Sequence, residues 1–546
     1  MKLTIAALSI MSATAATSLR RRLSFQKITG YEPGTQVTDH AAIDLDQRAI
    51  ESFLAEQTES SFAKARNVYA SGAHSKSVAT VTLTTGGLTS ALADDTPISG
   101  ISVDGQEVTG IAYGSFDAGA TEIQIQYSTT DIQDSYVGCR VGAVAGTEYA
   151  MTSGCFNTTG TLTINGDANT YDYEYDVDAN NSNERHIAGF STSANDKMFV
   201  NSNKCPGCPY AEFVKYQSYY DDVNYADTWA TAAFSGGTTS FGNSAVNVDF
   251  SQYTLTGRAE CAKKGTAYMN VYMYVIREME DAIDDCDVNI LNNEEPVHAW
   301  DEAVAFYSGS LEGETGSSDG KLLYRLAEKR CQNFKTCGIY GDAIEGTSKV
   351  NYDIFDQFAL GQSRIVRGSC PDVRPVVQRI TALMAVPLIQ GTLRYAYKVD
   401  RLQGAEKEKA EGAVFAAAVL PRLSACSESD AQTVFNNMKV GASSTDFLAV
   451  KAAFENNYEC MEITCADVGG LYDSSVNAYY EDAGPCADPN AESDSSSDDT
   501  VAVALGITFG IIAFLALGGA IYMARREKSG SPVFKPSKTP HPNEMS

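Results

Sequence analysis

Histidine is scarce in this sequence, and its scarcity limits the chemistry available to the chain. Five histidines occur among 546 residues, and none stands in an H-E-x-x-H metal motif. The chain also lacks the G-x-S-x-G nucleophile motif and a glycine-rich phosphate loop. A histidine-rich metal centre is therefore excluded and a cysteine–histidine nucleophile is unsupported. The sequence predicts that the protein is not an enzyme.

Basic residues are also few. Lysine and arginine total 41 against 69 aspartates and glutamates, and the formal net charge is −28. Because a nucleic-acid binder needs a basic surface, this composition disfavours that class. An acidic surface raises the local concentration of cations, although acidity can equally serve only to keep a protein soluble. We expect no nucleic acid among the partners.

Two hydrophobic runs at the ends of the chain differ in length. Residues 1–16 combine a lysine, an apolar centre and a small-residue cleavage site, which is typical of a secretory signal peptide. Residues 501–523 carry no charge and are long enough to cross a bilayer. Arginines follow at once, which predicts a single-pass type I topology with residues 524–546 in the cytoplasm. The acidic, serine-rich residues 487–500 are expected to be a disordered linker.

The cysteines and the glycosylation sequences fit this exported location. All thirteen cysteines lie between Cys139 and Cys486, on the side of the membrane where disulfides form. An odd number leaves at least one thiol free or paired with another chain. The C-P-G-C segment at 205–208 is expected to be a structural bridge. Asn157 and Asn180 begin N-x-S/T sequences and are predicted glycosylation sites.

Three segments make up the predicted ectodomain. Residues 17–76 contain a helical pattern at 41–71 that ends at a glycine. Residues 77–189 alternate short Val/Ile/Thr/Tyr runs with Asp-Gly and Asn-Gly turns, the pattern of β-hairpins. Residues 190–486 have mainly helical periodicity. We therefore expect an α+β fold, mainly a helical repeat or bundle, with an N-terminal β-rich domain and one C-terminal transmembrane helix.

The helical segment contains internal similarities. Residues 300–309 resemble residues 226–236 and 410–416, and the helix at 320–330 resembles the one at 391–401. A helix pair repeated in this way cannot bury its apolar face alone. We therefore predict that the copies pack together as a bundle.

Oxygen donors are plentiful where nitrogen donors are not, since the chain has 29 tyrosines. Ferric iron is a hard cation that prefers phenolate and carboxylate oxygens. On a helix predicted over 266–286, Tyr274, Glu278 and Asp281 share one face, which Asp285 extends. Such acids repel one another unless a cation lies among them. The first three are candidate iron ligands; the alternative is a solvated acidic face.

A second group of donors occurs near the start of the helix that follows Pro296. His298, Asp301 and Glu302 lie within one turn of each other. They are candidate iron ligands, although acids in a first helical turn also suit the helix dipole. Glu411 aligns with Glu302 and lies in a helix that is apolar nearly all round, where a carboxylate needs a partner. Glu411 is therefore a fourth candidate in this group.

Arginines and a tyrosine form a third candidate face. Arg394, Tyr397 and Arg401 recur at helical spacing after Pro387, which is expected to kink or split their helix. Two arginines beside a phenol can hold a small anion such as carbonate. Arg330, which falls within the buried stripe of its own helix, joins them as a candidate anion-binding residue. The alternative is that these arginines pair with neighbouring acids.

Several long segments of this chain resemble the iron-assimilation domain of algal phytotransferrins, including the diatom iron-starvation-induced members. The similarity covers roughly residues 30–486 and is carried by WDEAVAFYSGSLEG, GKLLYRLAEKRCQNFKTCG, GTAYMNVYMYVIREMEDAIDDC, QGTLRYAYK and AEGAVFAAAVLPRLSAC. The resemblance implies a plasma-membrane protein that binds Fe³⁺ together with carbonate and delivers it to endosomes through the endocytic machinery. Protonation of the carbonate would then release the iron on acidification.

A different class of function is compatible with the same sequence. The glycosylated β-rich domain could be the functional part of a surface adhesion or carbohydrate-binding glycoprotein. Iron titration separates the two hypotheses, because only the first predicts stoichiometric binding of ferric iron in the presence of carbonate.

Overall fold

The computed structural model describes residues 27–72, 78–128, 156–176, 185–288 and 294–486, except positions 36, 95, 104, 105 and 108. All of these residues belong to the compact unit that ends at Cys486. The predicted signal peptide, linker, membrane helix and cytoplasmic tail lie outside the described residues, as do Asn180, Cys139 and Cys155.

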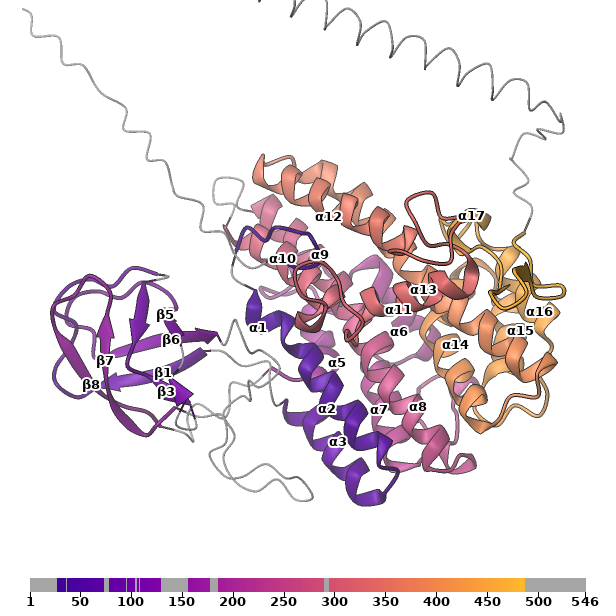
Figure 1. The fold of residues 1–546 in the computed structure, drawn as a ribbon, viewed down its shortest axis with the longest axis horizontal. Helices are drawn as coiled ribbons and strands as arrows, with labels where there is room; N and C mark the ends of the chain where they lie inside the picture. Colours follow the sequence, from indigo (N-terminus) through magenta and orange to yellow (C-terminus); the bar gives the residue numbers. More distant parts are fainter. Residues whose placement is uncertain are drawn as a thin grey trace, which may run out of the picture. The chain divides into compact units, whose positions relative to one another are not determined.

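The order of elements confirms an α+β fold in which helices predominate (Figure 1). Helices α1 (Thr38–Ala41), α2 (Ile43–Ala55) and α3 (Glu59–Ser71) come first. The helical pattern predicted over 41–71 is confirmed, and the structure divides it into separate helices. The chain breaks at Gln57, whose φ is 52°, and restarts at Thr58, whose side chain caps α3.

The β-rich segment forms a closed antiparallel barrel with the strand order β1-β6-β5-β2-β7-β8. Its interior is a separate core of aliphatic and tyrosine side chains that includes Val81, Ile125 and Tyr173. Alternate residues of β8 are buried, as expected for a strand with one face inward. The strands are β1 (Val78–Leu83), β2 (Pro97–Ser99), β5 (Thr109–Ala112), β6 (Glu122–Ser128), β7 (Thr159–Ile164) and β8 (Thr170–Glu174), with a small hairpin of β3 (Ser102–Val103) and β4 (Gln106–Glu107).

The Asn-Gly turn predicted in the β-rich segment is present, but the segment ends earlier than expected. The predicted Asn-Gly turn joins β7 to β8, where Gly166 has a φ of +88°. Asn157 is exposed, and its amide donates to Ser102 Oγ at 2.6 Å. The expected end of the β-rich segment at 189 was too late, because helix α5 already begins at Ile187.

The rest of the described chain is helical. The helices are α5 (Ile187–Thr192), α6 (Ala211–Tyr220), α7 (Tyr225–Ser235), α8 (Leu255–Gly265), α9 (Tyr272–Val288), α10 (Glu294–Ser308), α11 (Leu323–Phe334), α12 (Lys349–Val366), α13 (Val373–Arg401), α14 (Glu406–Cys426), α15 (Glu428–Met438), α16 (Phe447–Glu455) and α17 (Cys465–Val468), followed by the strands β9 (Tyr472–Asp473) and β10 (Ala478–Tyr479). Short 3₁₀ turns are η3 (Ser244–Val246), η4 (Phe250–Gln252), η6 (Ser310–Glu312) and η7 (Cys370–Asp372), and π-helical turns are η2 (Asn195–Phe199) and η5 (Thr266–Val271). The segments predicted as repeats are helical; their relation as copies stays a prediction.

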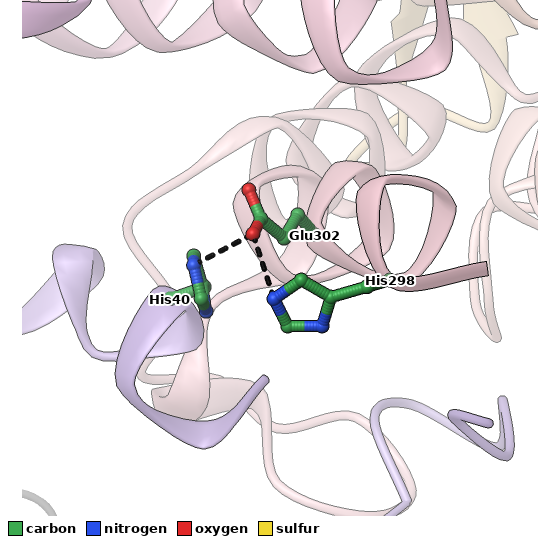
Figure 2. Close-up of side chains that lie close together, drawn as sticks. All are labelled: His40, His298 and Glu302. Atoms are coloured by element: carbon green, nitrogen blue, oxygen red, sulfur yellow. Dashed lines mark ion pairs between the residues drawn. The ribbon is translucent and has the colours of Figure 1, made fainter. Parts of the chain in front are cut away.

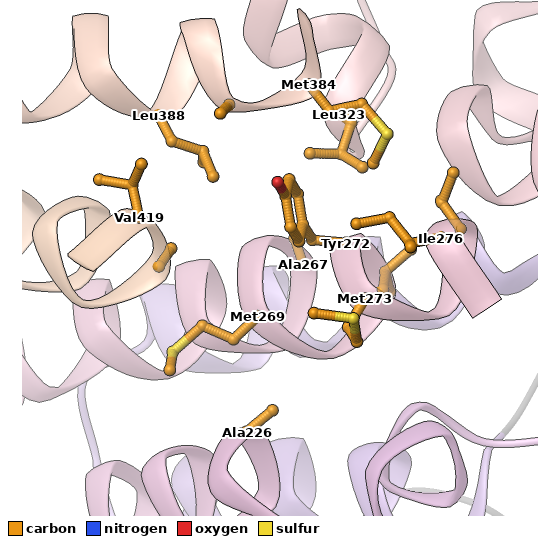
Figure 3. Packing of buried hydrophobic residues seen from close by; sticks show 14 of the residues in the cluster. Ala226, Ala267, Met269, Tyr272, Met273, Ile276, Leu323, Met384, Leu388 and Val419 are labelled. Carbon is orange, nitrogen blue, oxygen red and sulfur yellow. The ribbon is translucent and has the colours of Figure 1, made fainter. Parts of the chain in front are cut away.

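A continuous helical rod formed by α8, η5 and α9 runs through the core. Figure 3 shows Tyr272 at its centre among Met269, Met273 and side chains of neighbouring helices such as Leu388. Helix α14 packs along α8, and α10 packs along α9. The π-helical turn η5, between α8 and α9, rotates the side chains of α9 relative to those of α8. The polar residues of these two helices therefore face different neighbouring helices.

Helix α13 continues through Pro387. Of the two outcomes expected there, the split is wrong and the kink stays a prediction. The helix is buried over most of its length, and this packing compensates for the backbone hydrogen bond that proline cannot make. By length and composition the span Cys370–Arg401 could cross a membrane, but 89% of its most apolar window is buried inside the protein. It is a core helix.

Five disulfides lie within the described residues, and the expected structural bridge at 205–208 is one of them. They join Cys205 to Cys208, Cys286 to Cys370, Cys331 to Cys337, Cys426 to Cys460 and Cys465 to Cys486. Cys261 is a free and buried thiol.

Candidate metal centre

Two imidazoles and one carboxylate meet between α1 and α10 (Figure 2). Nε2 of His40 lies 2.9 Å from Oε1 of Glu302, and Nε2 of His298 lies 3.0 Å from the same oxygen. The three donor atoms are within 4.8 Å of one another. His298 and Glu302 lie on the same face of α10, because residues four apart are about one helical turn apart. His40 comes from α1, near the N-terminus.

Asp301 holds the N-terminal segment against α10. Its carboxylate accepts from the Tyr31 hydroxyl at 2.6 Å, from the Gly34 amide at 2.7 Å and from the Thr35 hydroxyl at 2.8 Å. A Cβ on Gly34 would come within 2.8 Å of Val297, so glycine permits this close approach. Asp301 therefore has a structural role that fixes where His40 enters the site.

The same contacts orient His298. The Thr35 hydroxyl donates its proton to Asp301, so its oxygen can accept from Nδ1 of His298, 3.1 Å away. A ring that carries its proton on Nδ1 directs Nε2 toward Glu302. Asp301 and Thr35 thus act on the site by setting the orientation of the imidazole.

The predicted face on α9 joins this group. Tyr274 stacks on Phe190 with ring centroids 3.9 Å apart. Phe306 of α10 contacts both Tyr274 and His40, with centroid distances of 5.4 and 5.7 Å. Phe306 therefore lies between the tyrosine of one predicted group and the histidine beside the other. The predicted groups on α9 and α10 are therefore neighbours, whereas the donor atoms close enough to share one cation are, among the described residues, those of His40, His298 and Glu302.

Burial and mutual repulsion characterise the acids of this site. Glu278 is 1% exposed, and burial, together with the charges of Glu302 and Asp281, raises its pKa to about 8 against the pull of Arg277. Burial and the charge of Glu302 also raise the pKa of Asp281. Burial, and then the charge of Glu278, also raises the pKa of Tyr274. These acids are close enough to oppose one another's ionisation.

Three cations compensate for part of this negative charge. Nη1 of Arg277 lies 2.6 Å from Glu278 Oε2, and its Nη2 lies 3.1 Å from Asp281. The Lys197 ammonium donates to the Tyr274 hydroxyl at 2.9 Å. Burial and the nearby Arg277 lower the pKa of Lys197. The third cation is Arg185, whose Nη2 lies 2.6 Å from Nε2 of His40.

One carboxylate oxygen in the site, Oε1 of Glu278, has no hydrogen-bond partner among the residues that the structure describes, although it is fully buried. A buried carboxylate oxygen without a donor is costly and marks a place where a cation would be stabilising. Glu302 behaves differently: against the effect of burial, His40 and His298 hold its pKa well below its usual value.

Glu411 lies outside this group. The expected partner exists: Lys264 Nζ is 2.8 Å from Glu411 and 2.5 Å from Glu260. Although burial acts in the opposite direction, Lys264 lowers the pKa of Glu411 to about 2. The described contacts of Glu411 connect it to α8, while the other predicted iron ligands lie on α9 and α10.

The predicted anion-binding residues lie on α11 and α13. Arg401 is close to Asp400 (3.2 Å) and Asp482 (3.8 Å), so for this arginine the alternative of pairing with acids holds. Tyr397 packs against Phe447 and Tyr480. Arg394 and Arg330 both lie over the ring of Tyr395. In the described part of the chain, no contact joins these residues to the α9 and α10 site.

The alternative of a solvated acidic face on α9 is contradicted for Tyr274 and Glu278, which are both buried. The periodicity could show that these residues share a face, but not that α10 packs on that face. His40, Lys197 and Arg185 were missing from the predicted site, because each comes from a distant segment and none has a local pattern that marks it.

Comparison of the chain with protein-family models, curated proteins and solved structures finds no match. The resemblance to phytotransferrins therefore rests on the sequence segments alone.

Proposed function

We propose that this chain is a phytotransferrin-like cell-surface protein that captures Fe³⁺, with the iron bound between α9 and α10. The observation that supports it most directly is the meeting of His40, His298 and Glu302, whose donor atoms lie within 4.8 Å of one another, beside the helix that carries Tyr274, Glu278 and Asp281. Carboxylate and phenolate oxygens suit a hard trivalent cation, and imidazole is tolerated beside them.

The arrangement of His298 and Glu302 favours a cation between them. Nε2 of His298 lies 3.0 Å from Glu302 Oε1, close enough for the two atoms to share a proton. A metal ion would replace that proton and accept electron pairs from both atoms. The unpartnered Oε1 of Glu278 adds a further donor. The cations Lys197 and Arg277 would have to yield as the charge of the metal replaces theirs.

Carbonate fits the same proposal. Ferric iron bound by a few protein oxygens keeps open coordination positions, and carbonate can fill two of them. The charge of the anion then needs a cation nearby, and Arg277 and Arg185 supply it at this site. Arg394, Arg401, Tyr397 and Arg330, which the sequence suggested for this role, would have to act elsewhere.

We further propose plasma-membrane anchoring by residues 501–523 and endocytic delivery of the bound iron, with release when acidification protonates carbonate. The apolar run, the signal peptide and the resemblance support this part of the proposal. The one described helix that is both long and apolar enough to span a bilayer is a core helix and does not bear on it.

Titration of the purified full-length chain with ferric iron tests the proposal. We expect one Fe³⁺ per chain in bicarbonate buffer and a visible ferric–tyrosinate absorption band from Tyr274. Stoichiometric binding without that band would retain the function and exclude Tyr274 as a ligand. Absence of iron binding in bicarbonate would overturn the proposal and favour the adhesion or carbohydrate-binding alternative.

A further inference from the structure

Arg330 is a buried cation that lacks an acidic partner. It is 7% exposed, and it points from α11 toward α13. Its Nε and Nη1 atoms are fully buried and have no hydrogen-bond partner among the described residues. Burial of an uncompensated guanidinium is costly, so folded proteins pair such groups with an acid or an anion.

The surroundings of Arg330 add positive charge. Its guanidinium lies 6.0 Å from the ring centroid of Tyr395, and the guanidinium of Arg394 lies 5.2 Å from the same ring. Burial, and then the repulsion from Arg394, lowers the pKa of Arg330, while Tyr395 and Tyr268 act in the opposite direction. In the described part of the chain, neither arginine forms an ion pair.

The nearest acids already have partners of their own. Glu411, whose charge acts on Tyr395, is bound to Lys264 at 2.8 Å. Glu51, whose charge acts on Tyr268, is 3.7 Å from Lys321. Neither carboxylate neutralises Arg330. Arg330 is buried and Arg394 is half-buried beside the same tyrosine, and neither has an acidic partner among the described residues.

We infer that Arg330 and Arg394, which both lie over the ring of Tyr395, form a binding site for a small oxyanion that is separate from the metal centre. Carbonate and phosphate share the required chemistry: a compact anion whose oxygens accept several N–H and O–H groups at once. The occupied site neutralises the pair of guanidinium groups and holds α11 against α13. Because it needs no metal, this inference does not rest on the proposed iron function.

The test uses the metal-free full-length chain, with thermal unfolding and calorimetric titration at constant ionic strength set by chloride. Bicarbonate and inorganic phosphate are the probes, and sulfate is the comparison anion. We expect at least one probe to bind saturably and to raise the melting temperature by several degrees, as for any ligand of the folded state. The stronger of the two probes identifies the source of the anion. No effect beyond that of chloride from any of the three would overturn the inference.

Variants locate the effect. Arg330→Met preserves side-chain length without the charge, and we expect it to lose the anion response while unfolding in chloride at the same or a higher temperature. Arg330→Lys should retain a response weakened about tenfold, since it keeps the charge and loses the planar donor group. Arg379→Met is the matched control, because Arg379 pairs with Asp467 at 3.2 Å. An unchanged response in Arg330→Met would exclude the site.

A third variant separates this site from the metal centre. Glu278→Gln should leave the anion response of the metal-free chain unchanged. A stronger response than that of the native chain would show that the anion binds at α9 and α10, where the change frees Arg277 from its acid, and would overturn a separate site. If Glu278→Gln loses iron while the anion response persists, the two proposals stand or fail independently.

Discussion

Glu278 on α9 and Glu302 on α10 lie close enough that, in addition to burial, the charge of Glu302 helps to raise the pKa of Glu278 to about 8. Two carboxylates in such a place favour a bound cation, because the metal removes the repulsion that destabilises their ionised forms.

Replacement of either carboxylate by its amide should weaken ferric binding. For Glu278→Gln and Glu302→Gln we expect a loss of affinity of roughly 100-fold, the upper end of what loss of a supporting contact costs a metal site. Competition with a chelator of known affinity measures it. Asp287→Asn is the control, because Asp287 is exposed on the same helix. Equal affinities in Glu278→Gln and the control would exclude Glu278 as a ligand.

Lys197 should act as a competitor of the metal. Its ammonium donates to Tyr274 at 2.9 Å, so it occupies space and supplies charge where iron would bind. In Lys197→Met the metal no longer has to displace a cation, and we expect affinity to rise about tenfold, the effect of one nearby charge at partial burial. Lys204→Met, an exposed change in the same region, should have no effect. A weaker iron complex in Lys197→Met would instead make Lys197 a carbonate-holding residue.

Iron retention should depend jointly on pH and carbonate. Protons compete with iron for carbonate and for carboxylate oxygens, so the apparent affinity should fall steeply as the pH is lowered from 8 to 5.5. Without bicarbonate, affinity should already be low at pH 8 and should change less with pH. Equilibrium dialysis with labelled iron measures both series. Identical affinities at pH 8 with and without bicarbonate would contradict carbonate as a ligand.

Much of the fold follows from local patterns in the sequence. Val297, Trp300, Val304 and Tyr307 share a helical face, and all four are buried. The failures lie where tertiary packing overrides local preference. Pro387 does not split α13 because neighbouring helices surround it. The break between α2 and α3 at Gln57 could not be predicted, because no proline or glycine lies there in the sequence.

The candidate site, like the fold, could be predicted from the sequence only where its residues share one helix. Helical spacing placed Tyr274 with Glu278, and His298 with Glu302, because these relations are local to one helix. The packing of α9 on α10 and the arrival of His40 depend on contacts between distant segments, which no periodicity encodes. The apolar surroundings of Glu411 correctly indicated a partner, but the same signal could not distinguish a metal from Lys264.

Glu411 provides a test of that distinction. In Glu411→Gln, Lys264 keeps Glu260 but loses one of its two acids, and we expect the free energy of unfolding to fall by about 2 kcal/mol at pH 7. Because the folded pKa of Glu411 is depressed to about 2, its contribution is present above about pH 4.5 and is lost as the pH falls toward 2. Denaturant titration at pH 7 and pH 3 measures this. Iron affinity should not change, and a tenfold loss would restore Glu411 as a ligand.

Glu312 should have the opposite dependence of stability on pH. It is 1% exposed, its Oε1 has no partner among the described residues, and burial raises its pKa to about 7 although Ser317 donates to its other oxygen at 2.8 Å. The folded state therefore binds this proton more tightly than the unfolded state does, and stability falls as the pH rises from about 4.5 through 7.

Glu312→Gln should remove that slope. The variant should match the native chain near pH 4.5 and exceed its unfolding free energy by at most about 3 kcal/mol at pH 8.5, the value that corresponds to the shift in pKa. Glu314→Gln, an exposed change two residues away, is the matched control and should follow the native curve. Denaturant titrations at the two pH values measure the difference. A native chain more stable than Glu312→Gln at pH 8.5 would mean that the ionised carboxylate is stabilised in the fold, through Ser317 or a cation bound beside it.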